Sequence, residues 1–237
     1  MHYYNSKTNY YGGNGIVGAQ LPVGTGLAFA LKYQGKPNFA CALYGDGAAN
    51  QGQLFEAANM AGLWNLPMIY ICENNHYGMG TSEHRGSHNT DFYKRGDKIP
   101  GLRIEAQNVL MVRETLKWAG KWVQENGPLF LEMDTYRYHG HSMSDPGVTY
   151  RTKEEIGEVR QNRDPVEIAR AYLIDNKMST LDETKAIEKD IRKRIEAEVE
   201  QIRKDPFPPL SELYTDIGTT PEHYVRGVEY HLTKHID

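Results

Sequence analysis

Residues 39–75 decide the fold, and they read FACALYGDGAANQGQLFEAANMAGLWNLPMIYICENN. The stretch opens with a short apolar run, residues 39–44, and closes with a second, residues 68–72. Between them, residues 50–64 have the composition of a helix. Strand, helix and strand in this order form a βαβ unit, whose two strands run parallel in one sheet. The stretch therefore predicts an α/β fold with strands buried on both faces and a ligand site beyond their carboxyl ends.

The sequence on either side adds further elements to this unit. Residues 17–33 and 109–125 have the composition of helices, and residues 129–133 form a third apolar run. The segment 78–101 is rich in Gly, Ser, His and Asn, which is typical of a loop. We therefore expect a parallel sheet flanked by helices.

The composition changes after a long polar segment, residues 134–151. Charged helices are expected from Lys153 onward, and the pattern predicts one of them over residues 180–204. That helix has an apolar stripe, which we interpret as ordinary packing, formed by Ile187, Ile191, Ile195, Val199 and Ile202. We therefore expect one domain over residues 1–150 and a helical C-terminal region over residues 151–237.

The composition excludes several classes of protein. The chain has 237 residues, of which 39% are hydrophobic, enough for one substantial core with a helical appendage. Its formal net charge of -4 provides no basic field for nucleic acid. No apolar stretch approaches the roughly 20 residues that a membrane span requires. Cys41 and Cys72 stand in apolar runs, so we interpret them as buried packing residues of a reduced, intracellular protein.

Two loops at the ends of the first two strands carry residues suited to a metal-bound diphosphate. Asp46 stands between Gly45 and Gly47 after the first strand, and Asn75 and Tyr77 follow the second. Mg²⁺ prefers hard oxygen ligands, which Asp46 offers as a carboxylate, Asn75 as an amide and Tyr77 as a backbone carbonyl. The glycines let backbone N–H groups approach phosphate oxygens, and the following helix adds the favourable end of its dipole.

The spacing of these loops resembles the signature of thiamine diphosphate enzymes. Gly45-Asp46-Gly47 is followed by residues 48–73 and then by Asn74-Asn75. The segment GDGAANQGQLFEA, residues 45–57, resembles the corresponding segment of the pyruvate dehydrogenase alpha subunit family. These proteins are thiamine diphosphate-dependent 2-oxoacid dehydrogenases. The resemblance covers nearly the whole chain, and it implies that the domain over residues 1–150 binds the diphosphate of thiamine diphosphate.

By this resemblance, Asp46, Asn75 and the Tyr77 carbonyl are the expected Mg²⁺ ligands. Gly47 and Ala48 are expected to contact the diphosphate.

The resemblance also assigns a role to the glycine cluster near the N-terminus. Gly15 and Val17 would meet the aminopyrimidine side of the cofactor and help to hold it bent, so that its two reacting groups lie side by side. The same segment, residues 13–18, satisfies the G-x-G-x-x-G pattern of dinucleotide sites. It follows a polar stretch instead of an apolar strand, and no acidic residue stands about 20 positions on, which argues against a nicotinamide site.

The polar segment after the third strand carries a second group of candidates. It reads YRYHGHSMSDPG over residues 136–147 and closely resembles the phosphorylation loop of pyruvate dehydrogenase alpha subunits. Arg137 has a planar fork suited to phosphate oxygens, and His141 can donate a proton or a hydrogen bond, so both are expected near the cofactor and His141 is the candidate catalytic residue. The expected phosphoacceptors are Ser142, Thr149 and Ser82.

The implied activity is oxidative decarboxylation of pyruvate with acetyl transfer to lipoyl groups. The implied partners are a beta subunit, in a heterotetramer of two alpha and two beta chains, the lipoyl domains of a dihydrolipoyl acetyltransferase, and a regulatory kinase and phosphatase. The implied location is the mitochondrial matrix, or the cytoplasm of a bacterium. The resemblance also leads us to expect further sequence before Met1, with a Tyr-Arg pair for the diphosphate.

Two alternatives to this activity remain. A branched-chain 2-oxoacid or acetoin dehydrogenase alpha subunit shares the cofactor loops, although the string over residues 136–147 favours pyruvate dehydrogenase. A non-catalytic scaffold or regulatory subunit is disfavoured by the intact set of Asp46, Asn75, Arg137 and His141.

Overall fold

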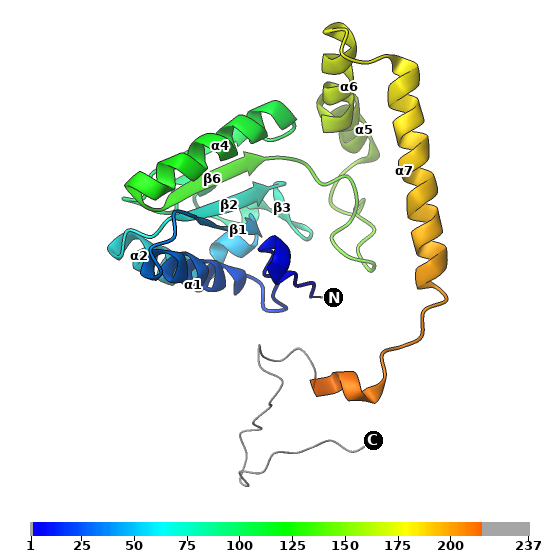
Figure 1. Ribbon diagram of the computed structural model, residues 1–237. Helices are drawn as coiled ribbons and strands as arrows, with labels where there is room; N and C mark the ends of the chain where they lie inside the picture. The colour runs from blue at the N-terminus through cyan, green and yellow to red at the C-terminus, as the bar shows by residue number, and fades with distance from the viewer. Residues whose placement is uncertain (1, 215–237) are drawn as a thin grey trace. The chain divides into compact units, whose positions relative to one another are not determined.

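The computed structural model describes residues 2–214, and the chain divides into two compact units, Met1–Met178 and Ser179–Asp237. The first unit holds the sheet and the second holds one long helix (Figure 1). Residues 215–237 of the expected C-terminal region lie outside the described residues. The two units are defined by contacts within the chain and not by ligand binding. The assignment of residues 1–150 to cofactor binding therefore stays a prediction.

A four-stranded parallel sheet forms the centre of the first unit. The strand order is β1-β2-β6-β5, with the bounds Ala40–Gly45, Met68–Asn74, Leu129–Asp134 and Gly101–Glu105. All three pairings are parallel. The predicted α/β fold with a βαβ unit is therefore confirmed.

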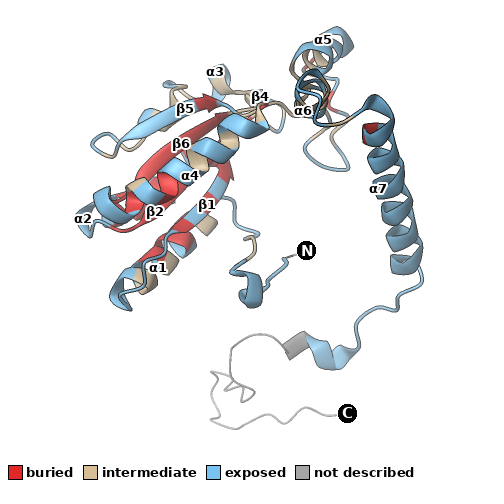
Figure 2. Ribbon diagram, turned by 45° about the horizontal axis from the view of Figure 1, so that its top comes forward, coloured by how far each residue is buried: buried red, intermediate tan, exposed pale blue. Residues whose placement is uncertain are grey.

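Helices cover the sheet on both faces. On one face lie α1, Gln20–Tyr33, and α2, Gly52–Leu63, and on the other lies α4, Val109–Asn126 (Figure 1). Alternate side chains of β2 serve the two faces: Met68 and Tyr70 join the core under α1 and α2, whereas Ile69 and Ile71 join the core under α4. Figure 2 shows the burial concentrated in β2 and β6. This two-sided burial explains why the central strands are nearly continuous apolar runs.

The edge strand β1 departs from the prediction of two buried faces. Ala40 and Ala42 point into the core, but Cys41 is exposed and Leu43 is 51% exposed. In the described residues the core under α4 contains side chains of β2, β5 and β6 and none of β1. The interpretation of Cys41 as a buried residue was therefore wrong, whereas that of Cys72 is confirmed.

The segment 78–101, predicted to be a loop, holds several short elements. They are the hairpin of β3, Tyr77–Gly78, and β4, Thr81–Ser82, then α3, Glu83–Gly86, and the 3-10 turn η3, Phe92–Lys94. The edge strand β5 begins where this segment ends. It was missed because only Ile104 of its five residues is buried, so no apolar run marks it.

The ends of the predicted helices shift by a few residues. A turn over residues 16–19 precedes α1, and the 3-10 turn η2, Ala48–Asn50, precedes α2. The remaining helices are α5, Lys153–Arg163, α6, Pro165–Asp175, and α7, Leu181–Ile202, with short 3-10 turns η1, Ser6–Thr8, and η4, Leu210–Tyr214. None of the helices in residues 2–214 is both long and apolar enough to cross a bilayer.

Helix α7 begins at a capping box. The Thr180 side chain accepts a hydrogen bond from the Glu183 N–H, and the Glu183 carboxylate accepts one from the Thr180 N–H. The five side chains of its apolar stripe are 40–65% exposed. The described residues of the unit that contains α7 therefore do not bury this stripe, as the predicted packing would require.

The burial pattern predicts unequal costs for two leucines of the same sheet. Leu131→Ala in β6 removes a fully buried side chain and should lower the free energy of unfolding by about 2–5 kcal/mol. Leu43→Ala on the exposed face of β1 should cost less than about 1 kcal/mol. Chemical denaturation of both variants measures the difference, and equal losses would contradict this assignment of the buried faces.

Candidate functional site

The parallel register brings three loops to one edge of the sheet. Gly45 of β1 pairs with Glu73 of β2, and Asn74 pairs with Asp134 of β6. Each strand therefore ends at nearly the same level, and the residues that follow lie side by side. Asp46, Asn75 and the loop after β6 come together in this way, as the sequence predicted.

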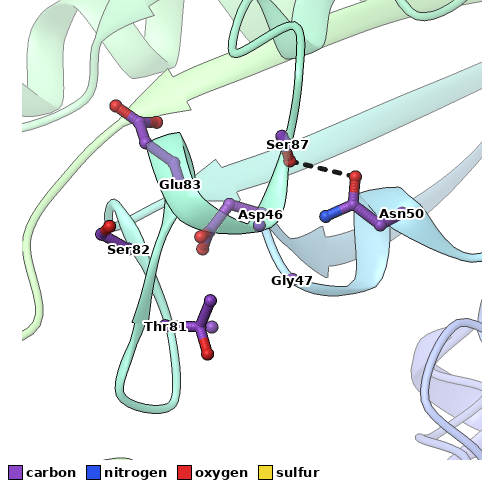
Figure 3. Close-up of a pocket in the computed structure, with 9 residues that line it drawn as sticks. Asp46, Gly47, Asn50, Thr81, Ser82, Glu83 and Ser87 are labelled. Atoms are coloured by element: carbon purple, nitrogen blue, oxygen red, sulfur yellow. Dashed lines mark hydrogen bonds between the residues drawn. The ribbon is translucent and has the colours of Figure 1, made fainter.

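A cavity of about 220 Å³ lies at this edge, between the turn after β1 and the β3–β4 hairpin. Figure 3 shows the Asp46 side chain directed toward the space that Thr81 and Ser82 line. The lining residues are Asp46, Gly47, Asn50, Gly78, Thr81, Ser82, Glu83, Gly86 and Ser87. Sequence reasoning singled out Asp46, Gly47 and Ser82. It missed Asn50, which stands at the start of the predicted helix, and the other lining residues, which lie in the stretch read only as loop.

Asp46 is the chemically distinctive residue of the cavity. Its side chain belongs to a residue that is only 3% exposed, and burial raises the pKa of its carboxyl group. A carboxylate in such a place is stabilised by a cation brought into the cavity. The site therefore fits a divalent metal ion.

Two glycines allow the loops around Asp46 to approach each other. A Cβ atom on Gly47 would lie 3.2 Å from the Gly78 Cα, and one on Gly78 would lie 3.1 Å from the Gly47 Cα. Larger residues at either position would push the hairpin away from the turn. The turn continues into η2, and the first N–H groups of such a turn have no acceptor within it.

The Asn75–Tyr77 loop shows the other two expected metal ligands already in contact with protein groups. The Asn75 side-chain oxygen accepts a hydrogen bond from the Tyr77 N–H at 3.2 Å. The Tyr77 carbonyl accepts one from Arg137 at 3.1 Å. A carbonyl or amide oxygen has a second lone pair, so both can still serve a metal ion. Their role as ligands stays a prediction.

Asn74, the first asparagine of the pair, is a structural residue. It is fully buried, and its side-chain NH₂ donates to Glu132 at 2.9 Å and to Glu83 at 3.0 Å. Its oxygen accepts a hydrogen bond from the His76 N–H. Glu132 is itself fully buried and also accepts from the Tyr93 N–H. This network fixes the loop after β2, and the signal for it was a glutamate in an otherwise apolar strand.

A second polar cluster lies at the end of β6, around Asp134. His76 lies between the carboxylates of Glu83, at 3.0 Å, and Asp134, at 3.3 Å. Arg103 and Arg163 also contact Asp134, at 2.6 and 3.1 Å. Burial alone would raise the pKa of Asp134, but the hydrogen bonds from these three side chains hold it well below its usual range. The hydrogen bond to Asp134 raises the pKa of His76.

Arg137 is directed at protein acceptors. Four of its hydrogen bonds run to the carbonyls of Tyr77, Met79 and His139 and to the Tyr150 hydroxyl. An arginine has five N–H donors, so these bonds leave one for another acceptor. Arg137 thus joins the loop after β6 to the β3–β4 hairpin, and its expected contact with phosphate stays a prediction.

The remaining candidates of this loop lie at its surface. His141, Ser142 and Thr149 are exposed. They line neither the cavity beside Asp46 nor a second cavity, which is lined by His76, Tyr77, Ser82, Glu83, His84, Tyr136 and Glu155. The His141 N–H donates to Asp145 at 2.8 Å, and the Ser142 and Ser144 hydroxyls are 3.2 Å apart. Ser82, by contrast, lines both cavities.

The glycine cluster near the N-terminus packs beside the same turn. The Gln53 side chain, at the start of α2, donates to the Val17 carbonyl at 3.2 Å. Gly18 has a φ of +92°, and a Cβ atom there would lie 3.1 Å from the Gln51 side chain. The structure therefore holds the segment of Gly15 and Val17 next to the residues that follow Asp46 in sequence.

Among residues 2–214, no three His, Cys, Asp or Glu side chains are arranged as a metal site. The expected ligand set lies outside that pattern, because it contains one carboxylate, one amide and one carbonyl. Such a set suits a Mg²⁺ ion that receives its other ligands from phosphate and water.

Comparison with known proteins identifies the class. The model of the dehydrogenase E1 component family matches residues 1–211, and the chain belongs to this family. Membership implies the use of thiamine diphosphate.

Individual relatives are similar over almost the whole chain. The chain is 53% identical over 227 residues to "Pyruvate dehydrogenase E1 component subunit alpha-1, mitochondrial" of Oryza sativa subsp. japonica, covering 96% of this chain and 57% of that protein. The alpha subunit, somatic form, of Homo sapiens is 53% identical over 96% of this chain and 58% of its own length. That of Dictyostelium discoideum is 54% identical, over 97% and 60%. The chain thus spans less than two thirds of these relatives.

The Asp134 cluster predicts a pH-dependent stability. Because the folded-state pKa of Asp134 is lowered, its contribution is fully present above the ordinary value of 3.8 and is lost as the pH falls below it. Asp134→Asn should therefore cost about 1.5–3 kcal/mol at neutral pH and less at pH ~2, where part of the contribution is already lost. Chemical denaturation at both pH values measures this, with the exposed Asp175→Asn as control. A loss that is the same at both pH values would contradict the assignment.

Proposed function

We propose that this chain is the alpha subunit of a pyruvate dehydrogenase component and that it holds the diphosphate and Mg²⁺ of thiamine diphosphate. The buried Asp46 carboxylate, facing a cavity at the carboxyl ends of β1 and β2, is the observation that carries the proposal. A carboxylate in that position needs a cation, and a metal-bound diphosphate supplies one.

Each group of expected ligands has its own task in this proposal. Asp46 provides the charged ligand for Mg²⁺, and Asn75 and the Tyr77 carbonyl provide neutral oxygens. Gly47 and Ala48 present backbone N–H groups to the diphosphate, since they open the turn that leads into η2. These residues neutralise and anchor the cofactor at one end.

The cofactor supplies, when bound, the nucleophilic carbon and the electron sink for decarboxylation. The chain's own residues position it for this work. Gly15 and Val17, held beside α2 by the Gln53 hydrogen bond, would keep it bent and thereby place its proton donor and acceptor groups next to each other. His141 is the candidate for proton transfer near the substrate, because its ring stands exposed on a loop fixed to the same edge of the sheet.

The relatives support the choice of pyruvate as substrate. Three relatives that are 53–54% identical to this chain are named as alpha subunits of pyruvate dehydrogenase E1 components. We propose oxidative decarboxylation of pyruvate with acetyl transfer to the lipoyl domains of a dihydrolipoyl acetyltransferase, carried out with a beta subunit in a heterotetramer. The mitochondrial names of the same relatives favour the mitochondrial matrix.

Phosphorylation is the proposed control of this activity. Ser142 and Thr149 lie exposed on the loop after β6, where a kinase can reach them, and Ser82 lines the cavity proposed for the cofactor. A phosphate adds a charge of about -1.5 to -2. At Ser142 this charge would stand close to Asp145, whose N–H donates to the Ser142 carbonyl at 3.1 Å, and would repel its carboxylate. A kinase and a phosphatase are therefore proposed partners.

Asp46→Asn should weaken the Mg²⁺-dependent binding of thiamine diphosphate by at least about 10- to 100-fold, because the charged metal ligand is lost. Isothermal titration calorimetry of the native assembly, with and without Mg²⁺, measures this. Asp91→Asn is the matched control, since Asp91 is a surface residue that pairs with Lys94. Unchanged affinity in Asp46→Asn would remove this residue from the site, and tight binding of NAD instead of thiamine diphosphate would overturn the proposed function.

Ser142→Glu should reduce acetyl transfer from pyruvate at least about tenfold, the factor that corresponds to 1.36 kcal/mol. The added negative charge disturbs the loop through Asp145, whereas the neutral Ser142→Gln, of similar size, should retain most of the activity. Steady-state assays with a lipoyl domain as acceptor compare the two variants. Equal activities would show that charge at this position does not control the loop.

A further inference from the structure

Arg151, at the end of the loop after β6, is a buried arginine with no role in the proposed chemistry. It is only 3% exposed. Its guanidinium donates to three carbonyls of the same loop: those of Arg137, of His139 at 3.1 Å and of Gly147 at 3.3 Å. These acceptors lie 4, 12 and 14 residues earlier in the chain, so one side chain contacts both the start and the end of the loop.

Three tyrosine rings surround the same guanidinium. Its central carbon lies 5.3 Å from the ring centroids of Tyr136 and Tyr150, and 5.5 Å from that of Tyr77. A cation over an aromatic face is stabilised by the ring quadrupole, and more so when it is removed from water. Carbonyl dipoles and ring faces together therefore balance the buried charge.

The loop that Arg151 holds is too tightly folded for other residues at two positions. A Cβ atom on Gly140 would lie 1.9 Å from the Asp145 carbonyl oxygen. Gly147 has a φ of +72°, and a Cβ atom there would lie 3.0 Å from the Gly140 nitrogen and 3.4 Å from an Arg151 nitrogen. The two glycines thus let the loop close around the guanidinium.

The same contacts reach the cofactor site. Arg151 holds the backbone of Arg137, and the Arg137 side chain donates to the Tyr77 carbonyl, an expected metal ligand. The Tyr77 ring also lies against Arg151 and against Tyr150, whose ring centroid is 5.3 Å away. Tyr150 in turn donates to Asp145, which holds the His141 backbone. The loop and the β3–β4 hairpin therefore share one set of contacts centred on Arg151.

We infer that Arg151 is a positioning residue that holds the loop of residues 136–151 folded against the β3–β4 hairpin and thereby sets the affinity of the Tyr77 side of the site for the metal-bound diphosphate. The effect on affinity rests on the proposed function, whereas the effect on the loop does not. Lysine cannot replace arginine here, because its ammonium lacks the planar fork that reaches several carbonyls at once.

The test compares Arg151→Lys with Arg160→Lys in the native assembly. Arg160 also lies over a tyrosine ring, that of Tyr138 at 5.1 Å, but it is exposed, so it is a matched arginine-on-tyrosine control. Hydrogen-exchange mass spectrometry without cofactor reports on the loop, and calorimetry with Mg²⁺ and thiamine diphosphate reports on the site. Gly147→Ala, which disturbs the same closure from the other side, serves as a second variant.

Arg151→Lys and Gly147→Ala should each speed exchange in peptides from residues 137–150 at least about tenfold, and should speed it much less in the peptides of strands β1, β2 and β6. The affinity for thiamine diphosphate should fall at least about fivefold in both and stay the same in Arg160→Lys. Unchanged loop exchange would overturn the inference. Faster exchange with unchanged affinity would overturn its link to the site. If the unmutated protein binds no thiamine diphosphate, the proposed function fails while the exchange result still judges the loop.

Discussion

The in-register ending of the parallel strands β1, β2 and β6 is the constraint on which the rest of the structure depends. It brings Asp46, Asn75 and the loop after β6 to one edge of the sheet, although they are far apart in the sequence. The buried amide of Asn74 secures this edge, because it bonds Glu132 in β6 and Glu83 beyond the hairpin. Removing one partner of such a network leaves a buried polar group unsatisfied, so the loops around it have little freedom to move.

The site is built in layers on this edge. Asn74 and Glu132 form the base, the Asp46 turn and the β3–β4 hairpin form the walls, and Arg137 joins the hairpin to the outer loop. The base and the walls are fixed by buried hydrogen bonds and close backbone contacts. The outer loop is held by contacts centred on the buried Arg151, whereas its His141 and Ser142 are exposed.

Local sequence patterns predicted much of the fold and part of the candidate site. The apolar runs of β1, β2 and β6, and the turn at Asp46, follow from composition over a few residues. The exposed face of β1 could not be foreseen, because it depends on where α4 lies. The role of Arg151 was also invisible, since its three acceptors and three rings meet only after the loop has closed. Glu132 carried a signal that was not used, because a charged residue inside an apolar strand indicates a buried polar network.

The central claim is that Asp46 binds the metal of a thiamine diphosphate complex at the carboxyl ends of β1 and β2. Its most direct test is a crystal structure of the native assembly with thiamine diphosphate and Mn²⁺ in place of Mg²⁺, in which anomalous scattering locates the metal. The account predicts one anomalous peak within about 2.0–2.3 Å of an Asp46 carboxylate oxygen, with Asn75 and the Tyr77 carbonyl as further ligands. A cofactor-bound metal that has no contact with Asp46 would contradict it.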